Sequence, residues 1–140
     1  MRARQFSLYI AVLASLAAAP MVYPVTTYAA DATAIQAKDG WYNKALVDFD
    51  FMRQNVSIPP KKGVVIIDSR PAARQYDPGH IPGAINIPDS QFDKLVDKLP
   101  VDKATLLLFY CGGLECMLSH NSAFKAEKLG YTNIKVYPAG

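Results

Sequence analysis

The sequence has few cysteines and little net charge. Only 2 of its 140 residues are Cys, so no disulfide framework can hold the fold, and one disulfide or one reactive site is the most they can form. The net charge of +3, with no basic run longer than Lys61-Lys62, excludes a typical nucleic-acid-binding protein. The length also excludes a large barrel or a two-domain enzyme.

Charge and hydropathy are uneven over the first 30 residues. Met1–Gln5 is basic, residues 6–19 are apolar and uncharged, and residues 20–30 are small and polar. This order is typical of a secretory signal peptide. The apolar run of 14 residues is shorter than the ~20 that a membrane span needs. An N-terminal anchor that stays uncleaved is the alternative.

Cleavage is expected after Ala29, or alternatively after Ala30, which leaves a mature chain of about 110 residues. The predicted organisation is a signal peptide over residues 1–29, an N-terminal extension over 30–49 and one domain over 50–140. We expect the mature protein to be periplasmic or secreted, where thiols can be oxidised, and to keep no stable membrane span.

Four apolar segments are predicted to be strands of one sheet. The runs Val64–Ile67 and Thr105–Tyr110 are continuous, which is typical of parallel strands buried on both faces. Shorter strands are predicted over Ala84–Ile87 and Ile134–Tyr137. Trp41 and the aromatic residues that follow it are expected to cover the core.

Three helices are predicted between and before these strands. Asp50 is expected to cap a short helix that ends at Asn55, and a longer helix is expected over 89–99, where apolar residues recur at spacings of three and four. Ser119 is expected to cap a third helix, which Gly130 ends. Strands that alternate with helices predict a single α/β domain with a central parallel sheet flanked by helices.

Cys111 directly follows a buried strand and precedes a helix. Ligands of open α/β sheets bind beyond the carboxyl ends of the strands, and a helix N-terminus stabilises an anion there. We therefore expect a lowered thiol pKa and a nucleophilic role for Cys111. Gly112-Gly113 allows the backbone to curl closely around it. The alternative is a small hydrophobic residue that closes the strand.

Two separated motifs resemble the signatures of rhodanese-like domains. The first is Ile66–Arg70 followed by Gly79–Pro88, and the second is Phe109–Gly113 followed by Ser119 and Gly130–Ile134. The resemblance covers roughly residues 50–140. It implies a sulfurtransferase fold in which Cys111 becomes a persulfide and passes its outer sulfur to an acceptor.

The cysteine loop departs from the common pattern of this family. Seven residues separate Cys111 from Ser119, more than the family usually has. The usual basic residue is missing, and the only charged residue, Glu115, would repel an anionic donor such as thiosulfate. Phosphatases on this fold need an Arg where this chain has Met117. The expected substrate-binding loop consists of Gly112, Gly113, Leu114, Glu115, Cys116, Met117, Leu118 and Ser119.

Cys116 lies on the same loop as the expected nucleophile. It could resolve a persulfide or sulfenate on Cys111 by forming a disulfide, or it could pack beneath the loop without reacting. The loop resembles an extracytoplasmic variant of the family with a Cys-x-Gly-x-x-Cys pattern. The two roles of Cys116 remain open at this point.

Five other polar residues are auxiliary candidates. Asp68 and Arg70 are expected to form an ion pair that fixes a loop, rather than to contact substrate. Arg74 is expected to be a solvated surface residue that could offer positive charge at the pocket mouth. His80 is expected in a hydrogen-bonded turn. His120 is expected to be exposed near the loop, where it could aid proton transfer.

Metal and cofactor sites are not expected. The spacing of Cys111, Cys116, His80 and His120 matches no standard zinc pattern. The sequence stops at Gly140, where the family usually continues into a closing helix. We expect a truncated domain, whose exposed apolar surface could let it self-associate as a homo-oligomer. The alternative is a fold that the aromatic N-terminal segment closes instead.

Three functions follow from the resemblance and the loop. The first is a sulfurtransferase that moves a sulfane sulfur through a Cys111 persulfide, with a small sulfane-sulfur donor or a protein thiol as partner. The second is a thiol–disulfide redox protein that uses Cys111 and Cys116. The third is a non-catalytic rhodanese module that binds or senses.

Overall fold

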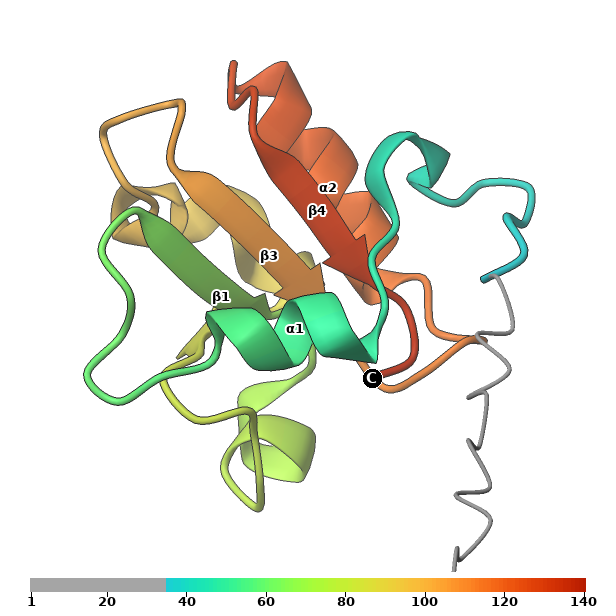
Figure 1. Ribbon diagram of the computed structural model, residues 1–140, viewed down its shortest axis with the longest axis horizontal. Coiled ribbons are helices and arrows are strands. Elements are labelled where there is room, and N and C mark those ends of the chain that lie inside the picture. The colour runs from blue at the N-terminus through green and yellow to red at the C-terminus, as the bar shows by residue number, and fades with distance from the viewer. Residues whose placement is uncertain (1–34) are drawn as a thin grey trace, which may run out of the picture. The chain divides into compact units, whose positions relative to one another are not determined.

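The computed structural model describes residues 35–140 (Figure 1). The predicted signal peptide and the first residues of the predicted extension lie outside the described residues. Within residues 35–140, no helix has the length and apolar character needed to cross a membrane.

A four-stranded parallel sheet forms the centre of the domain. Its strands are β1 (Val64–Asp68), β2 (Ile85–Asn86), β3 (Leu106–Tyr110) and β4 (Ile134–Tyr137), in the order β2-β1-β3-β4. β1 and β3 pair along their full length, so that Ile67 lies opposite Phe109, and Phe109 in turn lies opposite Val136. The predicted α/β class with a parallel sheet is confirmed, and the strand predicted over Ala84–Ile87 is shorter than expected.

Side chains alternate between the two covered faces of the sheet. Phe109 and Ile67 belong to one buried cluster, and Leu108 and Ile66 belong to the other. All four are at most 5% exposed, so both faces exclude water. Burying one such side chain contributes roughly 1.5–3 kcal/mol, which explains why the strands are continuous apolar runs.

Helices α1 (Phe49–Asn55) and α2 (Leu118–Lys128) cover opposite faces of the sheet (Figure 1). Met52 of α1 packs with Leu108, and Ala123 and Ala126 of α2 pack with Phe109. The remaining helical segments are η1 (Asn43–Ala45), η2 (Ala72–Tyr76), η3 (Asp89–Lys94) and η4 (Val96–Lys98).

The α-helix predicted over residues 89–99 is wrong. The segment forms two short 3₁₀ helices, η3 and η4, that meet at Leu95. Leu95 has φ −118° and ψ 18°, outside the α-helical region, and its N–H bonds to the carbonyl of Phe92 three residues back. Phe92 is fully buried, so packing of this side chain takes precedence over a regular helix.

The segment before α1 is integrated into the domain. Trp41 and Tyr42 are 4% and 5% exposed, as predicted for core residues, whereas Phe49 is 62% exposed and contradicts that prediction. Leu46 forms a parallel bridge to Val136, so this segment extends the sheet beyond β4.

The residue that caps α1 is Asp48, and the prediction of Asp50 is wrong. The Asp48 carboxylate accepts a hydrogen bond from the Phe51 N–H at 2.8 Å. Its backbone is extended, with φ −90° and ψ −177°, as a capping residue requires. Asp50 lies inside the first turn instead.

Replacing the two aspartates separately should distinguish their roles. Asp48→Ala should lower the free energy of unfolding by about 1 kcal/mol, because the Phe51 N–H loses its partner. Asp50→Ala is the matched control, because it removes only an exposed carboxylate with a 3.4 Å contact to Arg53. It should change the free energy of unfolding by less than about 0.5 kcal/mol. Urea denaturation measures both, and a larger effect for Asp50→Ala would contradict the assignment.

Candidate active site

Cys111 lies at the carboxyl edge of the parallel sheet, one residue beyond β3. The register places Asp68, Tyr110 and Tyr137 side by side at the ends of β1, β3 and β4. Segments that leave these strands therefore converge at one edge. The side chain of Cys111 is buried, with 1% of its surface exposed.

The loop after Cys111 folds back over its sulfur. The Cys116 N–H bonds to the Gly113 carbonyl at 2.9 Å and closes a tight turn. This turn places the Cys116 carbonyl 3.2 Å from the Cys111 Sγ, which donates its proton to that oxygen. Gly113 has φ +117°, a conformation that L side chains rarely adopt.

The end of the described chain packs directly against this turn. A Cβ added to Gly140 would lie 2.7 Å from the Gly113 nitrogen, so no larger residue fits there without a shift. Figure 1 shows the loop after β3 running beside the chain end marked C.

Ser119 contacts the nucleophile candidate and does not cap α2, so the capping prediction is wrong. The helix begins at Leu118, after Met117, whose side chain makes no capping bond. Ser119 therefore lies in the first turn, where it is fully buried. Its hydroxyl is 3.2 Å from the Cys111 Sγ, and its backbone N–H also acts to lower the pKa of that thiol.

The environment raises the pKa of the Cys111 thiol above its ordinary value, which contradicts the expected lowering. Burial is the main cause, and the neighbouring Cys116 side chain adds to it. The hydroxyl and N–H of Ser119 act in the opposite direction. The thiol is therefore protonated at rest, and Ser119 is the group that stabilises its thiolate.

Cys116 differs from Cys111 in exposure. Neither thiol is part of a disulfide, but Cys116 is half-buried whereas Cys111 is fully buried. The tip of the loop is open to solvent, since Leu114 is 49% exposed and the Glu115 side chain is 88% exposed.

Lys38 supplies a basic group to the loop that the loop sequence itself lacks. Its Nζ forms an ion pair with the Glu115 carboxylate and contacts the Leu114 carbonyl at 3.5 Å. It also lies 5.5 Å from the centre of the Trp41 ring. Sequence reasoning missed this residue because it precedes its partner by 77 positions.

His120 is fully buried, and the prediction of an exposed histidine is wrong. Its Nδ1 accepts the Tyr42 N–H at 3.0 Å, and its ring stacks on Trp41 with centroids 4.5 Å apart. The proton is therefore on Nε2, which has no hydrogen-bond partner among the described residues. Burial lowers the pKa of His120 to about 4.

The predicted ion pair between Asp68 and Arg70 is present and partly buried. Asp68 Oδ1 also accepts the Arg70 backbone N–H at 2.9 Å, and the Arg70 guanidinium bonds to the Gly79 carbonyl at 2.9 Å. This network joins the end of β1 to the turn before β2. The guanidinium lies 5.4 Å from the Tyr110 ring.

Two further candidates lie in η2 and the turn that follows it. Arg74 is exposed on η2. His80 bonds through Nδ1 to the Tyr76 carbonyl at 2.9 Å and stacks on the Tyr76 ring, as predicted for a turn histidine. Within residues 35–140, no group of three or more His, Cys, Asp or Glu side chains could hold a metal ion.

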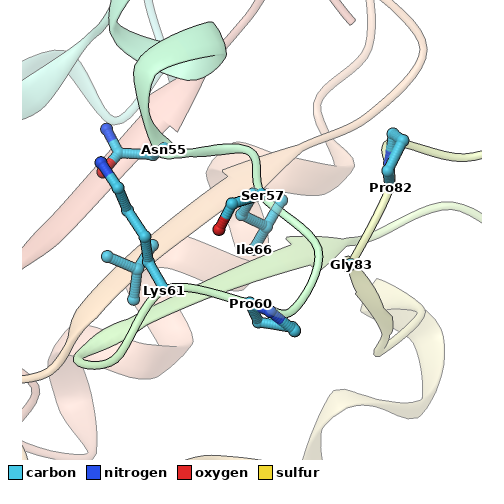
Figure 2. Close-up of a pocket in the computed structure, with 8 residues that line it drawn as sticks. Asn55, Ser57, Pro60, Lys61, Ile66, Pro82 and Gly83 are labelled. Atoms are coloured by element: carbon cyan, nitrogen blue, oxygen red, sulfur yellow. The ribbon is translucent and has the colours of Figure 1, made fainter.

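A small hollow beneath the connector from α1 to β1 contains no residue of the cysteine loop (Figure 2). Lys61 extends across it toward the end of α1, where its Nζ bonds to the Gln54 carbonyl at 2.6 Å. The Ser57 hydroxyl bonds to the Pro59 carbonyl at 2.8 Å. Both polar side chains already donate to a backbone carbonyl, so neither is free to bind a ligand in this hollow.

The comparisons with known proteins agree with this geometry. The model of the rhodanese-like domain family matches residues 55–140. An uncharacterized protein of Saccharomyces cerevisiae is 28% identical, with 70% of this chain and 88% of that chain covered and a TM-score of 0.56. A search of the curated proteins found no match.

Two further solved structures share the fold. A single-domain sulfurtransferase of Saccharomyces cerevisiae is 23% identical over 69% of this chain and 84% of its own, with a TM-score of 0.54. A protein of Bacillus halodurans is 24% identical over 68% and 67%, with a TM-score of 0.58.

The chain belongs to the rhodanese-like domain family, because the family model covers more than half of its length. Membership of this family supports a function of the sulfurtransferase type.

The buried His120 should make stability depend on pH. Its pKa is about 4 in the folded protein and about 6.5 in an unfolded chain. The unfolded state therefore binds the proton first, and the free energy of unfolding falls as pH drops from 6.5 toward 4. The full shift corresponds to roughly 3 kcal/mol.

Urea denaturation between pH 7 and pH 4 measures this effect. His120→Asn should lower stability at pH 7 but flatten the pH dependence. His80→Asn changes the exposed turn histidine, serves as the control and should keep the wild-type slope. A wild-type slope in His120→Asn would contradict this account.

Proposed function

We propose that the protein is a sulfurtransferase that carries a sulfane sulfur as a persulfide on Cys111 and passes it to a thiol or another nucleophilic acceptor. The observation that carries the proposal is the position of the Cys111 thiol at the carboxyl edge of the sheet, between the Ser119 hydroxyl and the Cys116 carbonyl. Family membership supports it. One protein of the same fold is described as a single-domain sulfurtransferase.

The chemistry consists of two displacements at sulfur. With thiosulfate as donor, the Cys111 thiolate attacks the sulfane sulfur, a new S–S bond forms, and the donor S–S bond breaks as sulfite leaves with the electron pair. The acceptor thiolate then attacks the outer sulfur, and Cys111 leaves as the thiolate. Both steps pass through the Cys111 thiolate, which the hydroxyl and N–H of Ser119 stabilise. No cofactor is needed.

The charges around the cysteine loop affect which sulfur donors can bind. Glu115 would repel an anion, but its ion pair with Lys38 offsets that charge. Small anionic donors are therefore acceptable, beside neutral or apolar ones. The basic and apolar N-terminal pattern of the sequence supports action in the periplasm or outside the cell.

A thiol–disulfide function is the second candidate. The turn that places the Cys116 carbonyl 3.2 Å from the Cys111 Sγ favours it, because this turn brings the two cysteines together on one loop. Such a protein would cycle between the free thiols and a Cys111–Cys116 disulfide.

Mass spectrometry of sulfur loading tests the proposed sulfur transfer. After incubation with thiosulfate or polysulfide, the wild type should gain one sulfur on Cys111, and Cys111→Ser should gain none there. Because the pKa of the Cys111 thiol is raised, the loading rate should keep rising with pH beyond about 8.5, the pKa of an ordinary thiol.

Ser119→Ala should lower the loading rate at pH 7 by roughly tenfold, because a hydrogen bond to an ionised group contributes about 1.5 kcal/mol. The matched control is Ser122→Ala, which removes a buried hydroxyl bonded to Asp89 at 3.3 Å. Wild-type loading by Ser119→Ala, or no sulfur on wild-type Cys111 with any donor, would contradict the proposed roles.

Lys38 should influence the choice of donor. Lys38→Ala leaves Glu115 without its partner and should raise the KM for thiosulfate about three- to tenfold at low salt, with less effect at high salt. The KM for a neutral dialkyl trisulfide should not change. Lys44→Ala removes a similar ion pair, with Glu127 at 2.8 Å, and is the matched control. If Lys38→Ala changed the KM for thiosulfate and for the trisulfide equally, the role of Lys38 in donor choice would be refuted.

A further inference from the structure

The two thiols of the loop differ in their access to solvent. Cys111 is 1% exposed, whereas Cys116 is half-buried. Two oxygen atoms, the Cys116 carbonyl and the Ser119 hydroxyl, each lie 3.2 Å from the Cys111 Sγ. A bulky acceptor, above all a thiol on another protein, therefore has poor access to a sulfur bound there.

The same geometry brings the Cys116 thiol to the buried sulfur. The turn closed by the Cys116 N–H and the Gly113 carbonyl folds the loop back toward Cys111. The Cys116 carbonyl lies 3.2 Å from the Cys111 Sγ, so the two cysteines are in direct contact across this turn. Cys116 is therefore a thiol that can reach Cys111 without any other molecule entering the site.

We propose that Cys116 is the first acceptor of the sulfur bound to Cys111 and the residue that presents it to the external acceptor. This inference rests on the proposed sulfurtransferase function and names its acceptor. In this scheme the enclosed Cys111 thiol receives the sulfur from the donor. The half-buried Cys116 thiol then passes it to the external acceptor.

The transfer balances without an oxidant or a reductant. The Cys116 thiolate attacks the outer sulfur of the Cys111 persulfide, so that an S–S bond to Cys116 forms and the S–S bond to Cys111 breaks. The electron pair goes to the Cys111 sulfur, which takes up the proton that Cys116 gave up.

Desolvation favours this direction of transfer. A persulfide ionises more readily than a thiol, and burial penalises the charged form. At Cys111 the anion is enclosed, whereas at Cys116 water can solvate it. The raised pKa of the Cys111 thiol has the same consequence, because Cys111 is held as the neutral thiol after it has released the sulfur.

The position of Glu115 makes the test direct. It lies between the two cysteines, so cleavage after Glu by a Glu-specific protease separates them into different peptides. The full chain is loaded with thiosulfate for increasing times, alkylated with iodoacetamide and cleaved. Mass spectrometry then measures the added sulfur on each peptide, and a second assay measures delivery to glutathione and to a reduced protein thiol.

The wild type should gain sulfur first on Cys111 and then on Cys116. Cys111→Ser should gain none on Cys116. In Cys116→Ser the persulfide should accumulate on Cys111, and delivery to the protein thiol should slow at least about tenfold. Cys116→Ala is the second variant, and urea denaturation checks that both variants fold.

Three results would overturn the inference. They are sulfur on Cys116 in Cys111→Ser, wild-type delivery by the Cys116 variants, and a Cys111–Cys116 disulfide with release of hydrosulfide in place of added sulfur on Cys116. Failure of the sulfurtransferase function itself is distinguishable, because no added sulfur would then appear on Cys111 in either the wild type or Cys116→Ser.

Discussion

The parallel register of β1, β3 and β4 is the constraint on which the rest of the site depends. Asp68, Tyr110 and Tyr137 end at the same level of the sheet. The Asp68–Arg70 network, the cysteine loop and the final residues all leave from that level. A shift of β3 by one residue would turn its buried side chains to the opposite faces and move Cys111 away from α2.

Burial and reactivity oppose each other at Cys111. The sheet and the folded loop exclude water from the thiol and thereby raise its pKa. The groups that act against this effect are few and close, namely the hydroxyl and N–H of Ser119. Such a site restricts which molecules reach the sulfur, and its reactivity depends on short-range hydrogen bonds rather than on nearby cations.

Local patterns in the sequence predicted the strands and the position of Cys111, because a doubly covered parallel strand is a continuous apolar run. They did not predict the surroundings of His120 or the partner of Glu115. These depend on the segment around Lys38 and Tyr42, which is distant in sequence and adjacent in space. The role of Ser119 was misassigned because a serine near a helix start has the same sequence pattern whether it caps the helix or turns inward.

The contact between Trp41 and His120 has a practical consequence. The chain contains a single tryptophan, and its ring stacks on the residue that follows Ser119. Any rearrangement in the first turn of α2 alters the surroundings of this indole. The intrinsic fluorescence of the protein therefore reports, without an added label, on the helix turn that contacts the reactive sulfur.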